Sequence, residues 1–338
     1  MPDVTVAIPV RNGGELFAGV LQALNAQTVA HELLVCDSHS SDRSVALARE
    51  HGARVLDVDP ARFTHGGARN LLMDAAHGTH VALLTQDSQP AHERWLEHLL
   101  AGFQLADDVA LVYGPYQPRP DASAPVRIEL ERWFASLSPA GSPQLQRLGE
   151  HERSLPVIEL LGRRGFFTDA NACVARSAWE QVRFREVAYA EDRVLAIDML
   201  RAGYAKAFVP DAATIHSHDY TAIQQLRRSF DEWRGLREVY GWCEPAAPAH
   251  LLRQLRGELA RTREELIVQG VAVAERRRTL GAVGRHHVVV RTGALLGSHA
   301  ERLPASLRRK LSLEGRASFV ALDLDGEQIP PPDQATDR

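Results

Sequence analysis

The first 115 residues alternate short apolar runs with segments of helical spacing, and this alternation constrains the fold more than any other feature of the chain. Val4–Val10 is the first β-rich run, and Leu16, Val20 and Leu24 then recur on one helix face. Further strands are expected at 33–36, 54–58, 80–85 and 109–113. Such alternation predicts an α/β fold, a Rossmann-like, mostly parallel sheet with helices on both faces.

The pattern changes twice further along the chain. Prolines interrupt residues 114–164, regular pattern returns at 166–209, and a helix is expected over 222–240. Pro245 and Pro248 then mark a boundary. We therefore expect one domain over 1–244, with a nucleotide-binding half at about 1–115 and an acceptor half at about 116–244. A basic and mainly helical region over 245–316 should follow, and then an acidic, flexible tail over 317–338.

Composition excludes several classes of protein. The 338 residues carry 39 Lys+Arg against 43 Asp+Glu, so no global basic footprint indicates nucleic-acid binding. Cys36, Cys173 and Cys243 have no Cys-x-x-Cys spacing, which argues against a disulfide framework and a cysteine zinc cluster. The N-terminus lacks the pattern of a secretory signal, and no apolar run approaches the roughly 20 residues of a membrane span. We expect a cytoplasmic protein, either free or peripheral on the inner face of the membrane.

Polar residues follow most of the predicted strands. In mostly parallel sheets, ligands bind beyond the carboxyl ends of the strands, so these residues are the candidates for chemistry. In chain order they are Ile8-Pro9-Val10-Arg11-Asn12, Asp37-Ser38-His39-Ser40-Ser41-Asp42, Phe63-Thr64-His65-Gly66-Gly67-Ala68-Arg69-Asn70, Thr85-Gln86-Asp87, Glu191-Asp192 and Ile215-His216-Ser217-His218.

Two of these residues fit a nucleotide. Asp37 ends a strand, where its carboxylate can accept the imino N–H of uracil or thymine, although a turn or helix-capping aspartate looks the same in sequence. Arg69 follows two glycines at a helix start, which lets the backbone approach a ligand and the arginine reach a base or phosphates. A solvent-facing arginine is the alternative.

Other residues fit a metal and a general base. Asp87 can hold a cation because substrate phosphates and waters complete the shell, but it can equally be a turn aspartate. His216 and His218 alternate, so at most one should bind the same metal if the strand continues. Glu191 and Asp192 point about 100° apart on a helix, so one can cap the helix while the other faces an acceptor. The alternative is that both stabilise the helix dipole.

Taken together and in this order, these phrases resemble the nucleotide-sugar domain of the inverting family-2 glycosyltransferases over about residues 3–240. Within that family, the sequence is most similar to the bacterial rhamnosyltransferase branch in three motifs: Phe63–Asn70, Thr85-Gln86-Asp87 and His216-Ser217-His218. The resemblance implies the GT-A fold and hexosyl transfer from a nucleotide-diphosphate sugar (dTDP-rhamnose, or a UDP- or GDP-sugar). The implied acceptor is a hydroxyl of a glycan or a lipid-linked acceptor in bacterial polysaccharide biosynthesis.

The resemblance also implies roles for individual residues. Asp192 is the general base, with Glu191 the next candidate, and Asp169 and Asn171 lie in a strand on the acceptor or donor-sugar side. Asp87 and His216 hold Mn²⁺ or Mg²⁺, and imidazole ligation favours Mn²⁺. The residues expected to bind the donor nucleotide are Pro9, Arg11, Asn12, Asp37, Arg69 and Asp87, with His65 and His218 as secondary site candidates.

One departure from the family pattern bears on the metal. The family usually carries Asp-x-Asp where this chain has Thr85-Gln86-Asp87, so the first acidic position is missing. The site therefore has one fewer anionic contact to the ribose or metal, which puts absolute metal dependence in question.

The basic C-terminal region has three interpretations. Residues 246–316 contain 14 Lys+Arg and 6 Asp+Glu, a net of +8, and their leucines sit near helical spacing. That pattern fits a peripheral membrane face, a homodimer interface or a solvated arginine-rich surface.

Two other functions remain open. A nucleotidyltransferase on a similar sheet would need a lysine in its Gly-rich loop, and Arg11-Asn12-Gly13-Gly14 has none. The missing first aspartate is consistent with a non-catalytic scaffold that binds nucleotide sugars.

Overall fold

The computed structural model describes residues 2–60, 63–160, 162, 164–187 and 189–313. Contacts divide the chain into two compact units, which we describe separately. The first comprises the described residues up to Pro120, Leu130–Glu186 and Glu191–Ser217, and the second comprises Asp121–Glu129, the described part of Val187–Ala190 and the described residues from His218 on. The expected tail over 317–338 lies outside the described residues.

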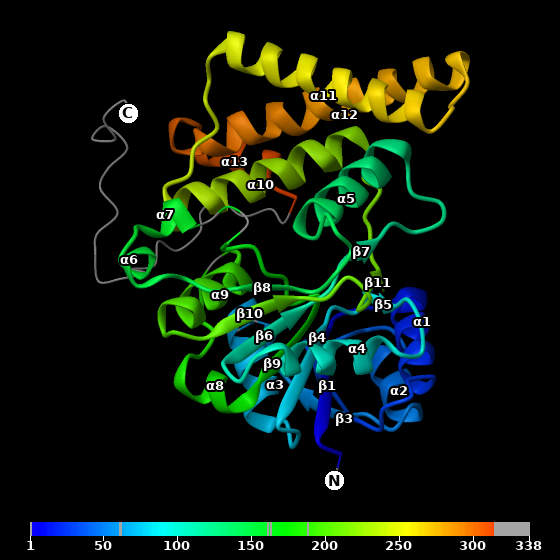
Figure 1. Ribbon diagram of the computed structural model, residues 1–338, viewed down its shortest axis with the longest axis vertical. Helices are drawn as coiled ribbons and strands as arrows, with labels where there is room; N and C mark the ends of the chain where they lie inside the picture. The colour runs from blue at the N-terminus through cyan, green and yellow to red at the C-terminus, as the bar shows by residue number, and fades with distance from the viewer. Residues whose placement is uncertain (1, 61–62, 161, 163, 188, 314–338) are drawn as a thin grey trace. The chain divides into compact units, whose positions relative to one another are not determined.

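A mostly parallel sheet forms the centre of the first unit (Figure 1). Strands β1, β2, β3 and β4 are mutually parallel, as are β6 and β10, while β9 is antiparallel to both β4 and β6 and β8 is antiparallel to β10. The predicted α/β sheet is therefore confirmed. The spatial order is β3 (Arg54–Asp57), β2 (Glu32–Asp37), β1 (Val4–Val10), β4 (His80–Leu84), β9 (Asn171–Ala175), β6 (Val109–Tyr113), β10 (Ala205–Phe208) and β8 (Gln144–Gln146).

Both faces of this sheet are buried. In β1, Ile8 packs in one apolar cluster with Phe17 of α1 (Gly14–Asn25), while its neighbour Ala7 packs in a second cluster with Leu72 of α3 (His65–Ala75). Burial on two faces explains why the strand reads as a continuous apolar run. The helical segments of this unit are α1 (Gly14–Asn25), α2 (Ser44–Glu50), α3 (His65–Ala75), α4 (Trp95–Ala101), η2 (Gly102–Leu105), α6 (Glu150–Arg153), α7 (Val157–Leu160), α8 (Arg176–Gln181) and α9 (Glu191–Arg201), and α5 (Ala124–Leu137) runs from the second unit into the first.

A second, very small sheet brings distant segments together near the candidate site. Its strands β5 (Gln89–Pro90), β11 (Thr214–Ile215) and β7 (Tyr116–Gln117) each have two residues, too few for a recognisable sequence pattern. Asp87 stands just before β5, and His216 directly follows β11.

One strand boundary differs from expectation. The sequence predicts that Asp169 and Asn171 share a strand, but β9 begins at Asn171, so Asp169 lies in the segment that leads into it. Strand alternation therefore does not determine the direction of the Asp169 side chain.

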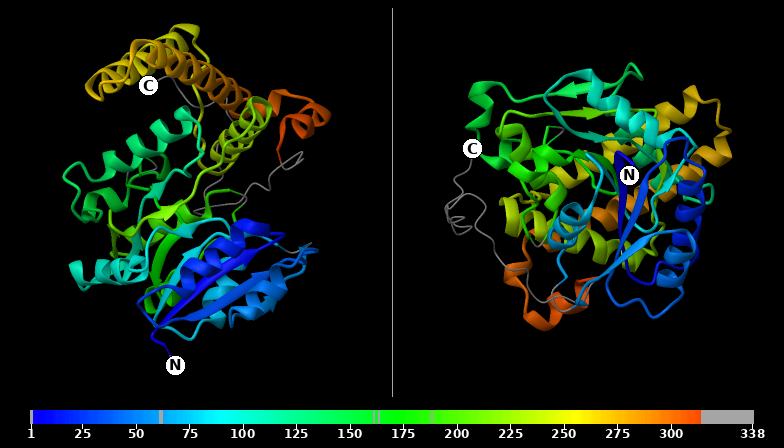
Figure 2. Two further views of the ribbon diagram at one scale, coloured as in Figure 1. Left: turned by 90° about the vertical axis from the view of Figure 1, so that its right-hand side faces the viewer. Right: turned by 90° about the horizontal axis from the view of Figure 1, so that it is seen from below.

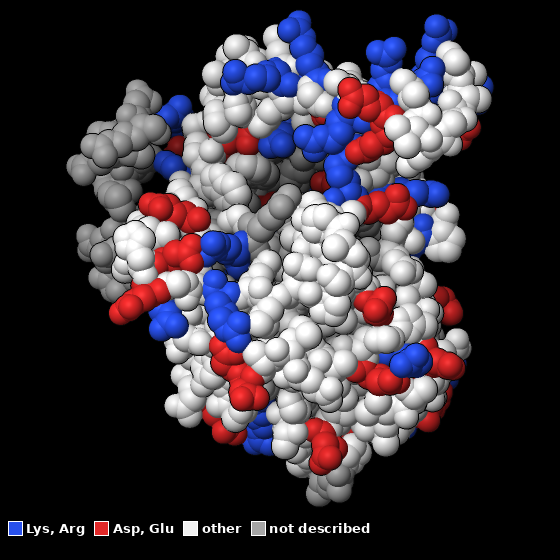
Figure 3. Space-filling view, in the orientation of Figure 1, with Lys and Arg blue, Asp and Glu red and all other residues white. Residues whose placement is uncertain are grey.

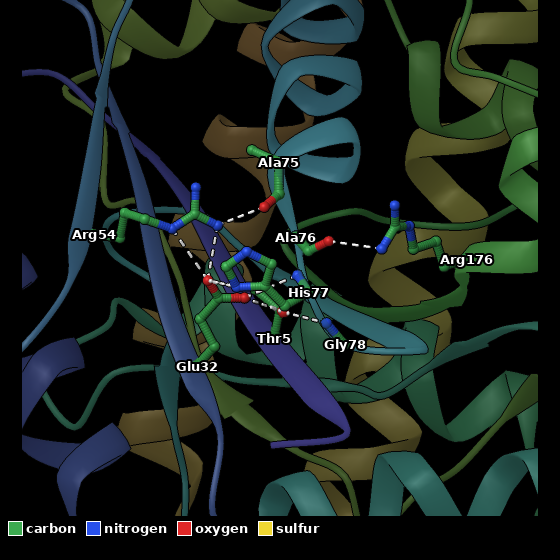
Figure 4. A network of polar contacts seen from close by, with 8 residues as sticks. All are labelled: Thr5, Glu32, Arg54, Ala75, Ala76, His77, Gly78 and Arg176. Carbon is green, nitrogen blue, oxygen red and sulfur yellow. Dashed lines mark hydrogen bonds and ion pairs between the residues drawn. The ribbon is translucent and has the colours of Figure 1, made fainter. Parts of the chain in front are cut away.

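A polar network joins three strands at the amino-terminal end of the sheet (Figure 4). Glu32 on β2 accepts hydrogen bonds from the Thr5 hydroxyl (2.7 Å) and the His77 N–H (3.0 Å), and it forms an ion pair with Arg54 (2.7 Å). Burial by itself would raise the pKa of Glu32, but these partners outweigh burial and lower the pKa to about 2. Glu32 therefore remains ionised and ties β1, β2 and β3 together.

The second unit is helical. Its elements are the first part of α5, α10 (Ala222–Tyr240), α11 (Pro248–Val268), α12 (Val273–Ser298), η3 (Ala300–Arg302) and α13 (Ala305–Leu311). The described part of the C-terminal region is thus mainly helical, as predicted. Figure 2 shows α11 and α12 side by side as a hairpin. Among the described helices, none has the length and apolar character needed to cross a membrane.

Close packing between α10 and α12 depends on glycine. A Cβ added at Gly293 would lie 2.5 Å from the Leu226 carbonyl oxygen, and one at Gly297 would lie 2.3 Å from the Phe230 carbonyl oxygen. Residues of α10 therefore belong to the same compact unit as the described C-terminal helices.

Candidate functional site

The loops at the carboxyl ends of β1, β2 and β4 are bound to one another. The Arg11 N–H donates to Gln86 Oε1 (2.8 Å), and the Asn12 N–H donates to Ser40 Oγ (2.9 Å). In return, Asn12 Oδ1 accepts from the Ser41 N–H (2.7 Å). The structure therefore brings Arg11 and Asn12 to the expected edge of the sheet, where Asn12 holds the loop after β2.

Asp37 is the last residue of β2, and its two carboxylate oxygens differ in their hydrogen bonding. Its Oδ2 accepts from the Ser40 N–H (3.0 Å), while the buried Oδ1 has no hydrogen-bond partner among the described residues. The residue is only 5% exposed, so an unpaired carboxylate oxygen there is costly. A ligand N–H donor at this position would remove that cost.

Arg69, a predicted donor-binding residue, is buried and bonded within the protein. Its guanidinium donates through Nε to Asp169 Oδ2 (2.7 Å), through Nη2 to the Asp169 carbonyl (2.9 Å) and through Nη1 to the Leu84 carbonyl (2.9 Å). With the residue 3% exposed, the guanidinium joins β4 to the segment before β9 instead of lying open to a nucleotide.

The two glycines before Arg69 also have a packing role. A Cβ on Gly66 would lie 2.3 Å from the Arg185 carbonyl oxygen, and one on Gly67 would lie 2.6 Å from Thr64 Oγ1. Thr64 caps α3 by accepting from the Gly67 N–H. The close backbone approach that these glycines permit is therefore an approach to the protein's own chain.

Asp87 and His216 meet beside the small sheet. His216 Nδ1 lies 3.6 Å from Asp87 Oδ1, and the edge of the Tyr116 ring packs against the imidazole with 4.7 Å between ring centres. The Tyr116 hydroxyl is hydrogen-bonded to Thr168. These contacts orient the imidazole toward the carboxylate.

The donor set at this point fits a divalent cation. In the described part of the chain, ligand atoms of Asp87, His216 and His218 all lie within 4.8 Å of one another. Because β11 ends at Ile215, strand alternation does not force the two histidines apart. Carboxylate and imidazole groups are both common ligands of divalent metal ions.

Arg119 also belongs to this site, although no sequence pattern points to it. Its Nη2 donates to the Asp87 carbonyl (2.6 Å), and its backbone N–H donates to Ser217 Oγ (3.0 Å). One arginine in a proline-punctuated stretch of an arginine-rich chain gives no signal, because the contact depends on β7 pairing with β11.

Three carboxyl groups gather at the start of α9. Burial, and then the charge of Asp169, raise the pKa of Glu191. Burial, followed by the charges of Asp169 and Glu191, likewise raises the pKa of Asp192. Glu191 is buried, whereas Asp192 is partly accessible, and Asp192 Oδ1 accepts from the Arg193 N–H (2.7 Å). A raised pKa makes a carboxylate a better proton acceptor.

Asn171 is a structural residue in this arrangement. It is fully buried, its Oδ1 accepts from Trp95 Nε1 (2.8 Å), and its Nδ2 donates to the carbonyls of Pro115 (3.0 Å) and Ala212 (2.8 Å). These bonds join β9 to the segments around the small sheet. Through these bonds Asn171 has a packing role, and its expected place on the acceptor or donor-sugar side stays a prediction.

Two further candidates have simple positions. Pro9 lies within β1, paired with Cys36 of β2. His65 is the exposed first residue of α3, with its ring 5.3 Å from the Phe63 ring. These positions do not assign either residue a chemical role.

Comparisons with known proteins identify the family of the chain. A family model described as glycosyl transferase family 2 matches residues 5–151. Over 250 residues the chain is 32% identical to the O-antigen chain rhamnosyltransferase RfbN of Salmonella typhimurium, covering 72% of this chain and 73% of the relative. It is 30% identical over 253 residues to WbaN of Salmonella anatum, also an O-antigen chain rhamnosyltransferase, covering 72% and 74%.

A solved structure shares the fold. It is the mannosyltransferase PcManGT from Pyrobaculum calidifontis in complex with GDP-Man and Mn²⁺, with a TM-score of 0.57 and 17% sequence identity. The match covers 88% of this chain and 87% of that one.

Proposed function

Because the chain belongs to glycosyltransferase family 2 and has the GT-A fold, we propose that it is an inverting, metal-assisted hexosyltransferase. In this proposal it transfers a sugar from a nucleotide-diphosphate donor to a hydroxyl of a glycan or lipid-linked acceptor. The observation that carries the proposal is the meeting of Asp87 and His216, 3.6 Å apart, beside the fixed positive charge of Arg119.

The donor base binds at Asp37 in this proposal. The uncommitted Oδ1 of Asp37 accepts the imino N–H of a uracil or thymine ring, which supplies the hydrogen bond that the buried oxygen lacks. The loop containing Arg11 and Asn12, held by Gln86 and Ser40, lies beside the nucleotide.

Asp87 and His216 hold the cation, and His218 is a third candidate ligand. When bound, Mn²⁺ or Mg²⁺ supplies charge neutralisation to the leaving diphosphate. Arg119 adds a positive charge that is already fixed in place, since its side chain is bound to the Asp87 carbonyl. This charge supports the leaving group in a site where Thr85 stands in place of the family's first aspartate.

Asp192 accepts the proton of the acceptor. The acceptor hydroxyl oxygen forms a bond to the anomeric carbon on the face opposite the leaving group, and the bond from that carbon to the diphosphate oxygen breaks. The diphosphate leaves with the bonding electron pair, and the hydroxyl proton moves to the Asp192 carboxylate. Asp192 suits this role better than Glu191 because it retains accessible surface.

The relatives favour one donor. Both Salmonella proteins are O-antigen chain rhamnosyltransferases, so we place dTDP-rhamnose first among the donors and bacterial polysaccharide assembly first among the processes. A UDP-sugar, or a GDP-sugar as in the PcManGT complex, is the next candidate. We further propose that the enzyme acts in the cytoplasm, either free or on the inner face of the membrane, where it would meet a lipid-linked acceptor.

Thermal stabilisation tests the donor site. Wild type and Asp87→Ala would be heated with dTDP, UDP and GDP and their sugars, with and without Mn²⁺, with exposed Asp107→Ala as the matched control. We expect a Mn²⁺-dependent rise in Tm with dTDP or UDP in wild type and Asp107→Ala, and no such rise in Asp87→Ala. If no nucleotide stabilises the wild type, the donor-site assignment is wrong. Donor binding without sugar transfer to any acceptor would instead favour the non-catalytic scaffold.

A further inference from the structure

The α11–α12 hairpin ends in a turn with exposed aliphatic side chains. Val268 is 88% exposed, Ile267 is 48% exposed and Val273 is 54% exposed. Gly270, with φ +71°, forms the turn between the two helices. We call residues 267–273 the hairpin tip.

The three exposed aliphatic residues of the tip, Ile267, Val268 and Val273, are separate from the buried residues of the hairpin. Leu266, directly before the tip, is buried, as is Val283 further along α12. The apolar residues that face the interior of this unit are thus distinct from those of the tip. A cluster of solvent-facing aliphatic side chains at one end of a hairpin is characteristic of a contact surface.

The charge around the tip is positive. Within residues 261–278 there are five arginines and three glutamates, and all eight are at least partly accessible. The arginines are Arg261, Arg263, Arg276, Arg277 and Arg278, and the glutamates are Glu264, Glu265 and Glu275. Figure 3 shows Lys and Arg side chains gathered over α11 and α12, at the top of the view.

The spacing of these groups matches the depth of a lipid headgroup layer. At the helical rise of about 1.5 Å per residue, Arg277 lies about 6 Å along α12 from Val273. Apolar helix faces of peripheral proteins bury about 5–10 Å into the headgroup boundary. Aliphatic side chains at the tip can therefore enter the acyl region while the arginines remain level with lipid phosphates.

We propose that the hairpin tip inserts into an anionic lipid surface. A second copy of the chain is a poorer occupant, since a stable interface takes about 20–30 residues a side and the tip has seven. A symmetric contact at the tips would also bring the two sets of Arg276–Arg278 together. Lipid binding by the tip does not depend on the proposed function. Only the suggestion that this binding brings the enzyme to a lipid-linked acceptor rests on the proposed function.

Vesicle co-sedimentation of the full chain tests the proposal. The probes are phosphatidylcholine vesicles with and without about 30% of the anionic lipid phosphatidylglycerol, because an anionic surface attracts basic segments. The variants are Val268→Ser/Val273→Ser at the tip, Arg277→Glu/Arg278→Glu beside it, and Leu252→Ser as the matched control. Leu252 on α11 is 53% exposed, which matches Val273 (54%), and it lies about 24 Å along the helix from Val268.

We expect wild type and Leu252→Ser to bind the anionic vesicles alike, and each double variant to bind about tenfold more weakly. Circular dichroism, Tm and the nucleotide-dependent Tm shift would be unchanged in the variants, which separates this test from that of the donor site. Three results would overturn the proposal: no binding of the folded wild type to anionic vesicles, equal binding by the tip variant, or equal weakening by Leu252→Ser. A dimer that the tip substitutions dissociate, with vesicle binding unaltered, would identify a second copy as the occupant.

Discussion

Arg69 Nε lies 2.7 Å from Asp169 Oδ2, so a buried ion pair joins two residues that are 100 positions apart in the chain. The same guanidinium also bonds to the Leu84 carbonyl at the end of β4, three residues before Asp87. Arg69 is therefore a positioning residue between the loop with the candidate metal ligand and the carboxyl cluster at α9.

Arg69→Met should destabilise the protein strongly. The change leaves the Asp169 carboxylate buried without its counter-charge, and we expect a loss of about 3–5 kcal/mol in the free energy of unfolding by urea titration. Asp74→Asn, on the surface, should change it by no more than about 0.5 kcal/mol. Equal effects of the two variants would contradict the role given to Arg69.

Asp192→Asn should lower kcat by about 100-fold or more, because an amide cannot accept the proton of the acceptor hydroxyl. Wild-type kcat should rise with pH, since burial and then the charges of Asp169 and Glu191 raise the pKa of Asp192 and acid keeps it protonated. Glu191→Gln removes one of those charges, so the rising limb should move to lower pH. An unmoved limb, measured in steady-state pH profiles, would argue against this coupling.

Arg119→Met should weaken stabilisation of the leaving diphosphate. We expect kcat/KM for the donor to fall by about tenfold to 100-fold, with partial recovery in Arg119→Lys, because lysine keeps the charge but not the guanidinium geometry. Mn²⁺ binding in the absence of donor should change little. Arg94→Met, on an exposed helix start, is the control that should retain wild-type kinetics.

Glu32→Gln should destabilise the sheet in a pH-dependent manner. The folded state lowers the pKa of Glu32 from 4.5 to about 2, so its ionised form contributes stability above about pH 4.5 and that contribution disappears as pH falls toward 2. We expect wild type to exceed the variant by about 2 kcal/mol at pH 7, with the difference shrinking in acid. Denaturant titrations at pH 7 and pH 3 check this, and a constant difference would contradict it.

Gly297→Ala should destabilise the second unit by about 1–3 kcal/mol, because the new Cβ meets the Phe230 carbonyl at 2.3 Å. Gly281→Ala in the same helix meets only the end of the Arg285 side chain at 3.5 Å. There, helix propensity should dominate and stability should rise by up to about 1 kcal/mol. Thermal unfolding of the two variants should therefore shift in opposite directions.

Much of the candidate site was predictable because each residue follows a strand that can be recognised locally. The runs that became β1, β2 and β4 are apolar on both faces, so their ends place Asp37 and Asp87 at one edge of the sheet. The sequence motifs at these strand ends resemble those of the family-2 glycosyltransferases, and the comparisons confirm that family.

The sequence by itself thus determined the α/β class, the family and which loops face the ligand edge, because periodicity and strand-end residues are local properties. Tertiary structure decided the roles of individual polar side chains. Arg69 bonds to Asp169, Asn171 bonds to Trp95, and Arg119 reaches Asp87. These partners lie 32 to 100 residues apart, and no local pattern encodes which of many arginines or amides will meet which acceptor once the sheet has closed.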